Sequence, residues 1–203
     1  MILGIELSPS SIRAVALDRH RLGRPPEGLA EIPCIVDAEG LPPVSALADI
    51  PRKFPGRLAG LAIVVPSSWC RFRTVHFPYR SVGRIDATLQ YSLETRLPGS
   101  VEDFIVEPAG RPRPSGESGA SILAVAAAKD RLRRLVERFQ SAGLDPAALI
   151  PAPVALANAV GHSPDEPVLL IRDQPAGVDA VLVLGNHAAA TVWVRSEEHT
   201  SEL

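Results

Sequence analysis

The chain has 203 residues, of which 46% are hydrophobic and 22% are charged, and its formal net charge is −2. This composition is typical of a folded protein and excludes a collagen-like chain, a disordered acidic tail and a small disulfide-stapled module. The sequence has no long block of like charges, which is the pattern that would predict a nucleic-acid partner. No apolar run approaches the ~20 residues of a membrane-spanning helix, and no charged leader precedes the first strand, so we expect a cytoplasmic protein.

The first third of the chain predicts a sheet with one short helix. The predicted elements are strands at 2–7, 12–17 and 29–36, a helix at 44–50 and a strand at 61–65. The turn Ser8–Ser11 between the first two strands predicts a β-hairpin. Pro33 confines the third strand to a sheet edge, because proline has no amide hydrogen for a ladder bond. Pro51 is expected to end the helix.

Strands and helices alternate in the rest of the chain, which predicts an α/β or α+β protein. The predicted elements are strands at 71–77, 104–106, 122–126 and 148–150, helices at 85–97, 129–142 and 154–160, a loop at 110–120, and a strand pair at 168–171 and 178–184.

The helix at 129–142 has the clearest pattern. Its apolar face consists of Leu132, Leu135, Val136 and Phe139. We expect this face to pack under the same sheet as Ile85, Leu89 and Leu93. Gly143 occupies the position of a C-terminal cap. The opposite face carries Arg131, Arg133, Arg134 and Arg138. A solvated face is the simpler interpretation, and contact with acidic lipid or a partner is the alternative.

The turn after the first strand is the most informative motif. Backbone amides of a small-residue turn can bind a phosphate, and Glu6 before it could face a hydrated metal ion. The candidate residues are Glu6, Ser8, Ser10 and Ser11. An ordinary serine-rich turn is the alternative. Cys34 and Cys70 lack metal-ligand spacing, and free thiols are the simpler interpretation, with one disulfide as the alternative.

Three stretches in order resemble one family. LGIELSPSSIRAVAL resembles the first phosphate loop of actin-like ATPases, in the form found in the type IV pilus assembly protein PilM. VVPSSWCRFRTVHFP with LQYSLETRLPGSVEDF resembles the start of the subdomain inserted in that family, and ILAVAAAKDRLRRLVERFQSAGLDPAALIPAPVALANAV resembles its remainder. LETRLPGSVEDF also resembles the cytoplasmic domain of the type II secretion protein GspL.

The resemblance implies a fold and a domain division. We expect an actin-like (ribonuclease H-like) α/β subdomain at 1–66 and 152–194, with an inserted ferredoxin-like α/β subdomain at 67–151. The segment 195–203, RSEEHTSEL, matches in frame the translation of a common sequencing-adapter read. We therefore expect it to be foreign and unpacked, and the chain to be an N-terminal fragment whose C-terminal half is missing. A native polar tail is the alternative.

The sequence departs from the family at both phosphate loops. The first loop should read Asp and then Gly, where this chain has Glu6 and Ser8, and Pro9 removes an amide donor. The second loop retains Asp173 and Gly177, but Arg172 and Pro175 interrupt its pattern. We therefore expect weak or absent binding of ATP and Mg²⁺, and no catalytic or metal-ligating residue.

The function that the resemblance implies is that of a cytoplasmic scaffold, peripheral to the inner membrane, in a type IV pilus or type II secretion platform. Its partners would be an inner-membrane platform protein and an assembly ATPase, with membrane association indirect or through the missing segment. A functional ATPase, sugar-kinase-like enzyme or nucleotide-dependent switch of the same fold is the alternative, in which Glu6 would organise Mg²⁺ and water.

Overall fold

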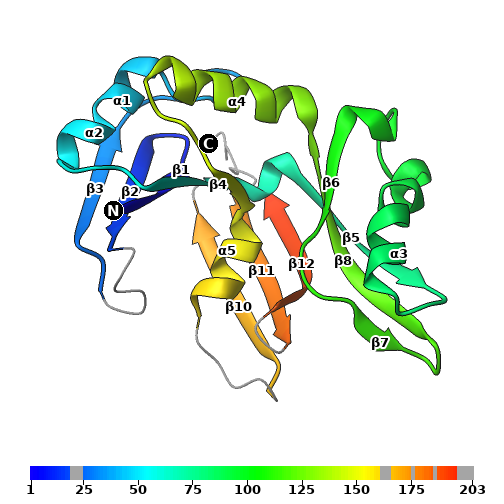
Figure 1. Ribbon diagram of the computed structural model, residues 1–203. Helices are drawn as coiled ribbons and strands as arrows, with labels where there is room; N and C mark the ends of the chain where they lie inside the picture. The colour runs from blue at the N-terminus through cyan, green and yellow to red at the C-terminus, as the bar shows by residue number, and fades with distance from the viewer. Residues whose placement is uncertain (19–24, 161–165, 175–176, 185–186, 196–203) are drawn as a thin grey trace, which may run out of the picture. The chain divides into compact units, whose positions relative to one another are not determined.

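In the computed structural model the chain divides into two units (Figure 1). The structure describes residues 1–18, 25–160, 166–174, 177–184 and 187–195. Unit 1 consists of Met1–Pro66 with Lys129–Ala152, and unit 2 of Ser67–Ala128 with Pro153–Leu203. The predicted subdomain boundary at 151 differs from this division, which assigns 129–152 to unit 1. Within the described ranges, no helix is long and apolar enough to cross a bilayer.

Unit 1 contains a mixed sheet of five strands in the order β3-β2-β1-β4-β9. The strands are β1 (Ile2–Leu7), β2 (Ser11–Leu17), β3 (Gly28–Pro33), β4 (Gly60–Val65) and β9 (Ala148–Pro151). β1, β2 and β3 are antiparallel, as the predicted hairpin requires, whereas β4 runs parallel to β1 and to β9. β3 is an edge strand, as Pro33 predicts.

Helices α1 (Val44–Ala48), α2 (Ile50–Lys53) and α4 (Lys129–Ser141) lie along one face of this sheet (Figure 1). Alternate residues of the strands are buried on that face, and Ile5, Ile12 and Ile63 are fully buried. The predicted helix at 44–50 is interrupted at Asp49, and Pro51 lies in the first turn of α2 rather than ending a helix. Proline suits that position because first-turn amides lack intrahelical partners.

Helix α4 packs in unit 1, so the expectation that it lies under the same sheet as Ile85, Leu89 and Leu93 is wrong. Those three residues belong to a separate hydrophobic cluster in unit 2. The chain leaves α4 for β9, which pairs with β4, and α4 therefore forms the crossover between two parallel strands of unit 1. The end of the helix is as predicted, because Gly143 has φ +75° and Leu144 N donates to Phe139 O over 3.0 Å.

The arginine face of α4 binds a loop of its own unit. Arg138 pairs with Asp37 at 3.0 Å, and Arg134 with Glu39 at 3.0 Å, while Arg131 donates to the Glu39 carbonyl. Asp37 also accepts the amide of Leu41, and this bond is the largest cause of its lowered pKa. Three of the four arginines thus bind the loop at 37–42, while Arg133 and Arg134 remain exposed, as expected for a solvated face.

Unit 2 contains an antiparallel sheet in the order β5-β8-β6, with β7 also paired to β8. The elements are η1 (Ser67–Trp69), β5 (Cys70–Phe77), α3 (Val82–Leu89), η2 (Tyr91–Arg96), η3 (Val101–Asp103), β6 (Phe104–Pro108), β7 (Arg113–Ser115) and β8 (Gly119–Ala128). The helix predicted at 85–97 thus begins three residues earlier and continues as a 3₁₀ segment. The loop predicted at 110–120 contains β7 and its hairpin to β8.

A second, three-stranded sheet of unit 2 follows helix α5 (Ala152–Ala159). Its strands are β10 (Val168–Gln174), β11 (Gly177–Leu184) and β12 (His187–Arg195), in the order β10-β11-β12. The predicted strand pair is confirmed. Arg195 is the last residue of β12 and pairs with Gly177, so the expectation that it is unpacked is wrong. Residues 196–203 lie outside the described residues.

We predict that Phe139→Ala destabilises unit 1 by about 3–5 kcal/mol, because the ring is fully buried and its removal leaves a cavity. Urea denaturation followed by circular dichroism measures the loss. Val136→Ala is the control on the same helix, since Val136 is only half-buried and should cost clearly less. Equal losses in the two variants would contradict the packing of α4 described above.

Candidate functional site

The turn between β1 and β2 uses its own amides. Ser8 N donates to Ser11 O over 2.9 Å, and Ser11 N donates to Ser8 Oγ over 3.1 Å. Pro9 has no amide hydrogen. The Ser10 carbonyl accepts a hydrogen bond from Cys34 N over 3.0 Å, which anchors the turn to the chain after β3. The turn therefore offers at most the Ser10 amide to a phosphate, whereas phosphate cradles use several.

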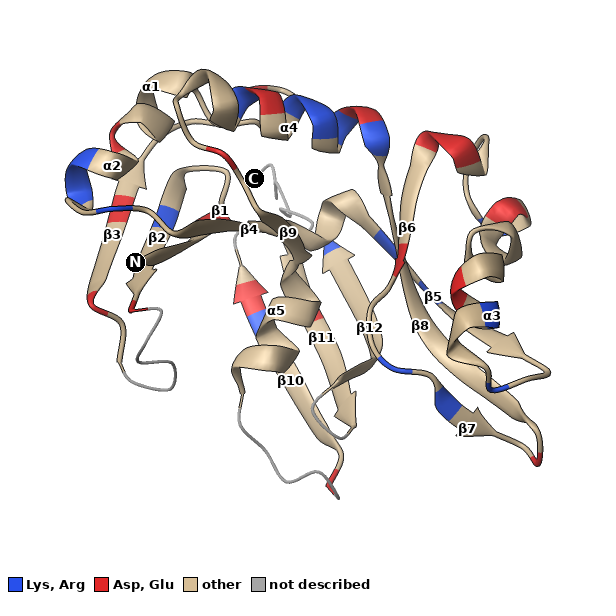
Figure 2. Ribbon diagram, viewed as in Figure 1, with Lys and Arg blue, Asp and Glu red and all other residues tan. Residues whose placement is uncertain are grey.

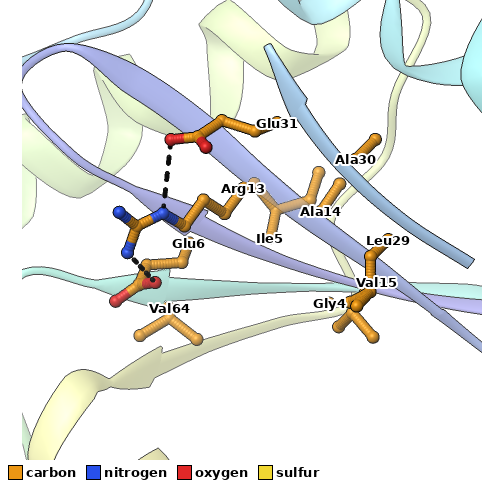
Figure 3. A pocket seen from close by; sticks show the side chains of 10 residues that line it. All are labelled: Gly4, Ile5, Glu6, Arg13, Ala14, Val15, Leu29, Ala30, Glu31 and Val64. Atoms are coloured by element: carbon orange, nitrogen blue, oxygen red, sulfur yellow. Dashed lines mark hydrogen bonds and ion pairs between the residues drawn. The ribbon is translucent and has the colours of Figure 1, made fainter. Parts of the chain in front are cut away.

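Three charged side chains form a row across the neighbouring strands (Figure 3). Glu6 lies opposite Arg13 in the pairing of β1 with β2, and Arg13 lies opposite Glu31 in the pairing of β2 with β3. The guanidinium of Arg13 is 3.7 Å from the carboxylate of Glu6 and 3.4 Å from that of Glu31. Glu6 is thus compensated by a cation of the chain, unlike a carboxylate that is free to hold a hydrated metal ion.

Glu31 links this row to the turn. Its Oε1 accepts a hydrogen bond from Ser11 Oγ over 2.6 Å. This hydroxyl is the largest cause of the lowered pKa of Glu31, and the hydrogen bond and charge of Arg13 lower it further. Glu31 is therefore ionised at neutral pH, and the Ser11 hydroxyl is already engaged by a carboxylate that would repel a phosphate.

A groove of about 450 Å³ lies over β1, β2 and β3, with the charged row as part of its lining (Figure 3). We call it the β1–β3 groove. It is lined by Gly4, Ile5, Glu6, Arg13, Ala14, Val15, Leu29, Ala30, Glu31 and Val64. Leu29 leaves 76% of its surface exposed there. Exposed leucine surface beside paired charges suits an aliphatic segment better than a nucleotide phosphate chain.

The two remaining predicted nucleotide residues, Asp173 and Gly177, belong to unit 2. Asp173 is exposed on β10, opposite Val178. Gly177 has φ +149°, and a Cβ there would lie 2.2 Å from the Val194 carbonyl oxygen. The glycine is thus explained by close pairing of β11 with β12. Within the described ranges, no group of His, Cys, Asp and Glu is arranged to hold a metal ion.

Sequence reasoning missed a buried charge cluster on β10 and β11. Asp179 is fully buried, and its Oδ2 accepts hydrogen bonds from Arg172 Nη2 and Gln174 Nε2, both over 2.8 Å. Arg172, which interrupts the family pattern, therefore compensates a buried carboxylate. Burial, with the charge of Asp179 as the second cause, raises the pKa of Cys70 to about 12. Cys70 is thus a protonated thiol, and both it and Cys34 are free.

The lowered pKa of Glu31 can be tested through its first cause. We predict that Ser11→Ala raises this pKa toward the ordinary value of 4.5, as measured by NMR titration of the carboxyl carbon. Because the folded pKa is depressed, the stabilisation is present above pH 4.5 and is lost as the pH falls through the folded pKa. The variant should show less of this acid-dependent loss. Ser10→Ala, which leaves the hydroxyl–carboxylate bond intact, is the control.

Comparisons with known proteins were made on sequence and on structure. No protein-family model matches the sequence, and no curated protein matches it significantly. Solved structures do match. A chain of the PilM–PilN type IV pilus biogenesis complex is 18% identical with a TM-score of 0.74, over 96% of this chain and 61% of that chain.

Two further structures match over most of this chain. The cytoplasmic domain of EpsL, an inner-membrane component of the type II secretion system of Vibrio cholerae, is 15% identical with a TM-score of 0.65, over 96% of this chain and 71% of that one. A Bacteroides thetaiotaomicron protein with an actin-like ATPase fold is 12% identical with a TM-score of 0.52, over 97% and 70%. The chain has the actin-like ATPase fold, in the form shared with the EpsL cytoplasmic domain and the PilM–PilN complex.

Proposed function

We propose that the protein is a scaffold of a type IV pilus or type II secretion assembly platform, which acts on the cytoplasmic side of the inner membrane and binds a segment of a membrane partner. The observation that carries the proposal is the fold match to a chain of the PilM–PilN complex, at a TM-score of 0.74. The match to the EpsL cytoplasmic domain supports the same role. This chain spans 61% of the matched pilus chain, so the proposal concerns only the part of the fold that this chain covers.

The β1–β3 groove is the binding site that we propose in unit 1. An extended or helical segment with aliphatic side chains would cover Leu29 and the neighbouring apolar strand residues. Arg13 and the two carboxylates beside it would fix the orientation of the segment through polar contacts at one place in the groove. No turnover is required of any residue in this arrangement.

The groove predicts a matched pair of variants. A fluorescently labelled cytoplasmic segment of the PilN counterpart from the same organism is titrated with the protein, and anisotropy gives the dissociation constant. Leu29→Glu should weaken binding about tenfold or more, because a charge replaces an apolar contact surface. Ile35→Glu is the control, since Ile35 is 86% exposed and does not line the groove. Absence of binding, or an equal loss in both variants, would contradict the proposal.

A measurement of nucleotide binding distinguishes the proposed scaffold from a nucleotide-dependent switch of the same fold. We expect calorimetry with ATP and Mg²⁺ to show no binding at micromolar nucleotide, because the turn amides are used within the hairpin and Glu6 is paired with Arg13. The complete protein is the proper sample. Micromolar affinity that is lost in Glu6→Gln would instead establish a nucleotide-dependent protein.

A further inference from the structure

A second concave site lies wholly in unit 2, among α3, the chain before β7, and β8. Its volume is about 490 Å³. We call it the arginine pocket, because its lining includes Arg80, Arg111 and Arg113, with Asp86 as its one carboxylate. Figure 2 shows basic segments on and beside β7. Counted over its lining residues, the arginine pocket therefore has a formal charge of +2.

Two of the three arginines of this pocket, Arg80 and Arg113, are held by neutral partners. Arg80 donates to the carbonyl oxygens of Gly116, Glu117 and Gly119 over 3.0, 3.0 and 3.1 Å. Arg113 donates to the carbonyl oxygen of Ala189 over 3.0 Å. Carbonyl groups satisfy N–H donors without cancelling the charge, and in the described part of the chain no carboxylate forms an ion pair with these arginines. The positive charge is therefore held in place and available to an anion.

The rest of the wall is apolar and poor in donors. Val82 is 55% exposed, and Ile122 is fully buried beneath the pocket. Pro108, Pro112 and Pro114 also line it, and proline has no amide hydrogen to offer. A ligand must therefore combine a carboxylate, which the guanidinium groups can bind, with an aliphatic group that covers the valine and the prolines. A bare phosphate or lipid headgroup would pair with the arginines but leave the valine and prolines exposed to solvent.

We propose that the arginine pocket binds a segment of a partner protein in which an aliphatic side chain is flanked by aspartate or glutamate. This interaction goes beyond the proposed function, because it uses unit 2 and none of the residues of the β1–β3 groove. The site recognises its ligand by charge complementarity, so binding weakens as salt is added.

The test uses the chain labelled with ¹⁵N and an acetylated peptide, Gly-Glu-Leu-Asp-Val-Glu-Gly. We expect amide shifts confined to residues around Arg111 and Val82. Arg111→Gln should weaken binding about threefold to tenfold, since it removes one exposed charge contact. It spares Arg80, which binds the β7–β8 turn, and Arg113, which binds β12. Arg71→Gln is the matched control, because Arg71 is an exposed arginine of β5 outside the pocket.

Three results would overturn the proposal: no shifts with the peptide, equal binding of an analogue with Asn and Gln in place of Asp and Glu, or equal effects of Arg111→Gln and Arg71→Gln. Vesicles of phosphatidylglycerol, with phosphatidylcholine as the neutral comparison, provide a further arm. Arginine-dependent binding to those vesicles without peptide binding would assign the pocket to lipid instead. Leu29→Glu should leave peptide binding unchanged, so that failure here is distinct from failure of the groove.

Discussion

Burial of β8 on both faces is the constraint on which unit 2 depends. Ile122, Ala124 and Ala126 pack in the cluster formed with α3, whereas Leu123 and Val125 pack in the cluster formed with β11 and α5. A strand covered on both sides cannot alternate apolar and polar residues, which explains the nearly continuous run GASILAVAAA. The alanines provide space for two layers to approach the same backbone. Any charged residue here would be buried whichever face it occupied.

Register plays the corresponding role in unit 1. The Ser8–Ser11 turn sets the pairing of β1 with β2, and that pairing places Glu6 opposite Arg13. A slip by one residue would turn every side chain of the strand to the other face and bury the charges. The same hydrogen bonds that hold the register also occupy the amides that a phosphate would need. In this chain, a well-determined hairpin and a phosphate cradle compete for the same groups.

Local sequence patterns predicted where the helices and strands lie better than they predicted which elements pack together. Periodicity identified α4, its buried Phe139 and its cap, but a helical period shows which face is buried and not which sheet covers it. That choice depends on β9, a strand of four residues whose pairing with β4 no local signal reveals. The buried Asp179 had a readable signal, because it shares the parity of Val181 and Val183 on β11. A carboxylate on an apolar face requires a partner, and only register identifies Arg172.

Two carboxylates near the predicted nucleotide loops are paired with arginines of the chain, which supports the proposed binding role. Glu6, at the first predicted nucleotide loop, is paired with Arg13, and Asp179, beside the second, accepts from Arg172 and Gln174. A carboxylate that organises Mg²⁺ and water for phosphoryl transfer needs its charge for the metal. Glu6 and Asp179 are each paired with an arginine of the chain, whereas Asp173, the acid predicted for the second loop, is exposed. Arg80 and Arg113 of unit 2 donate to carbonyl oxygens, which leave their charge uncancelled, as the proposed peptide site requires. This pattern of charge pairing supports the proposed scaffold role and the expectation that nucleotide binds weakly or not at all.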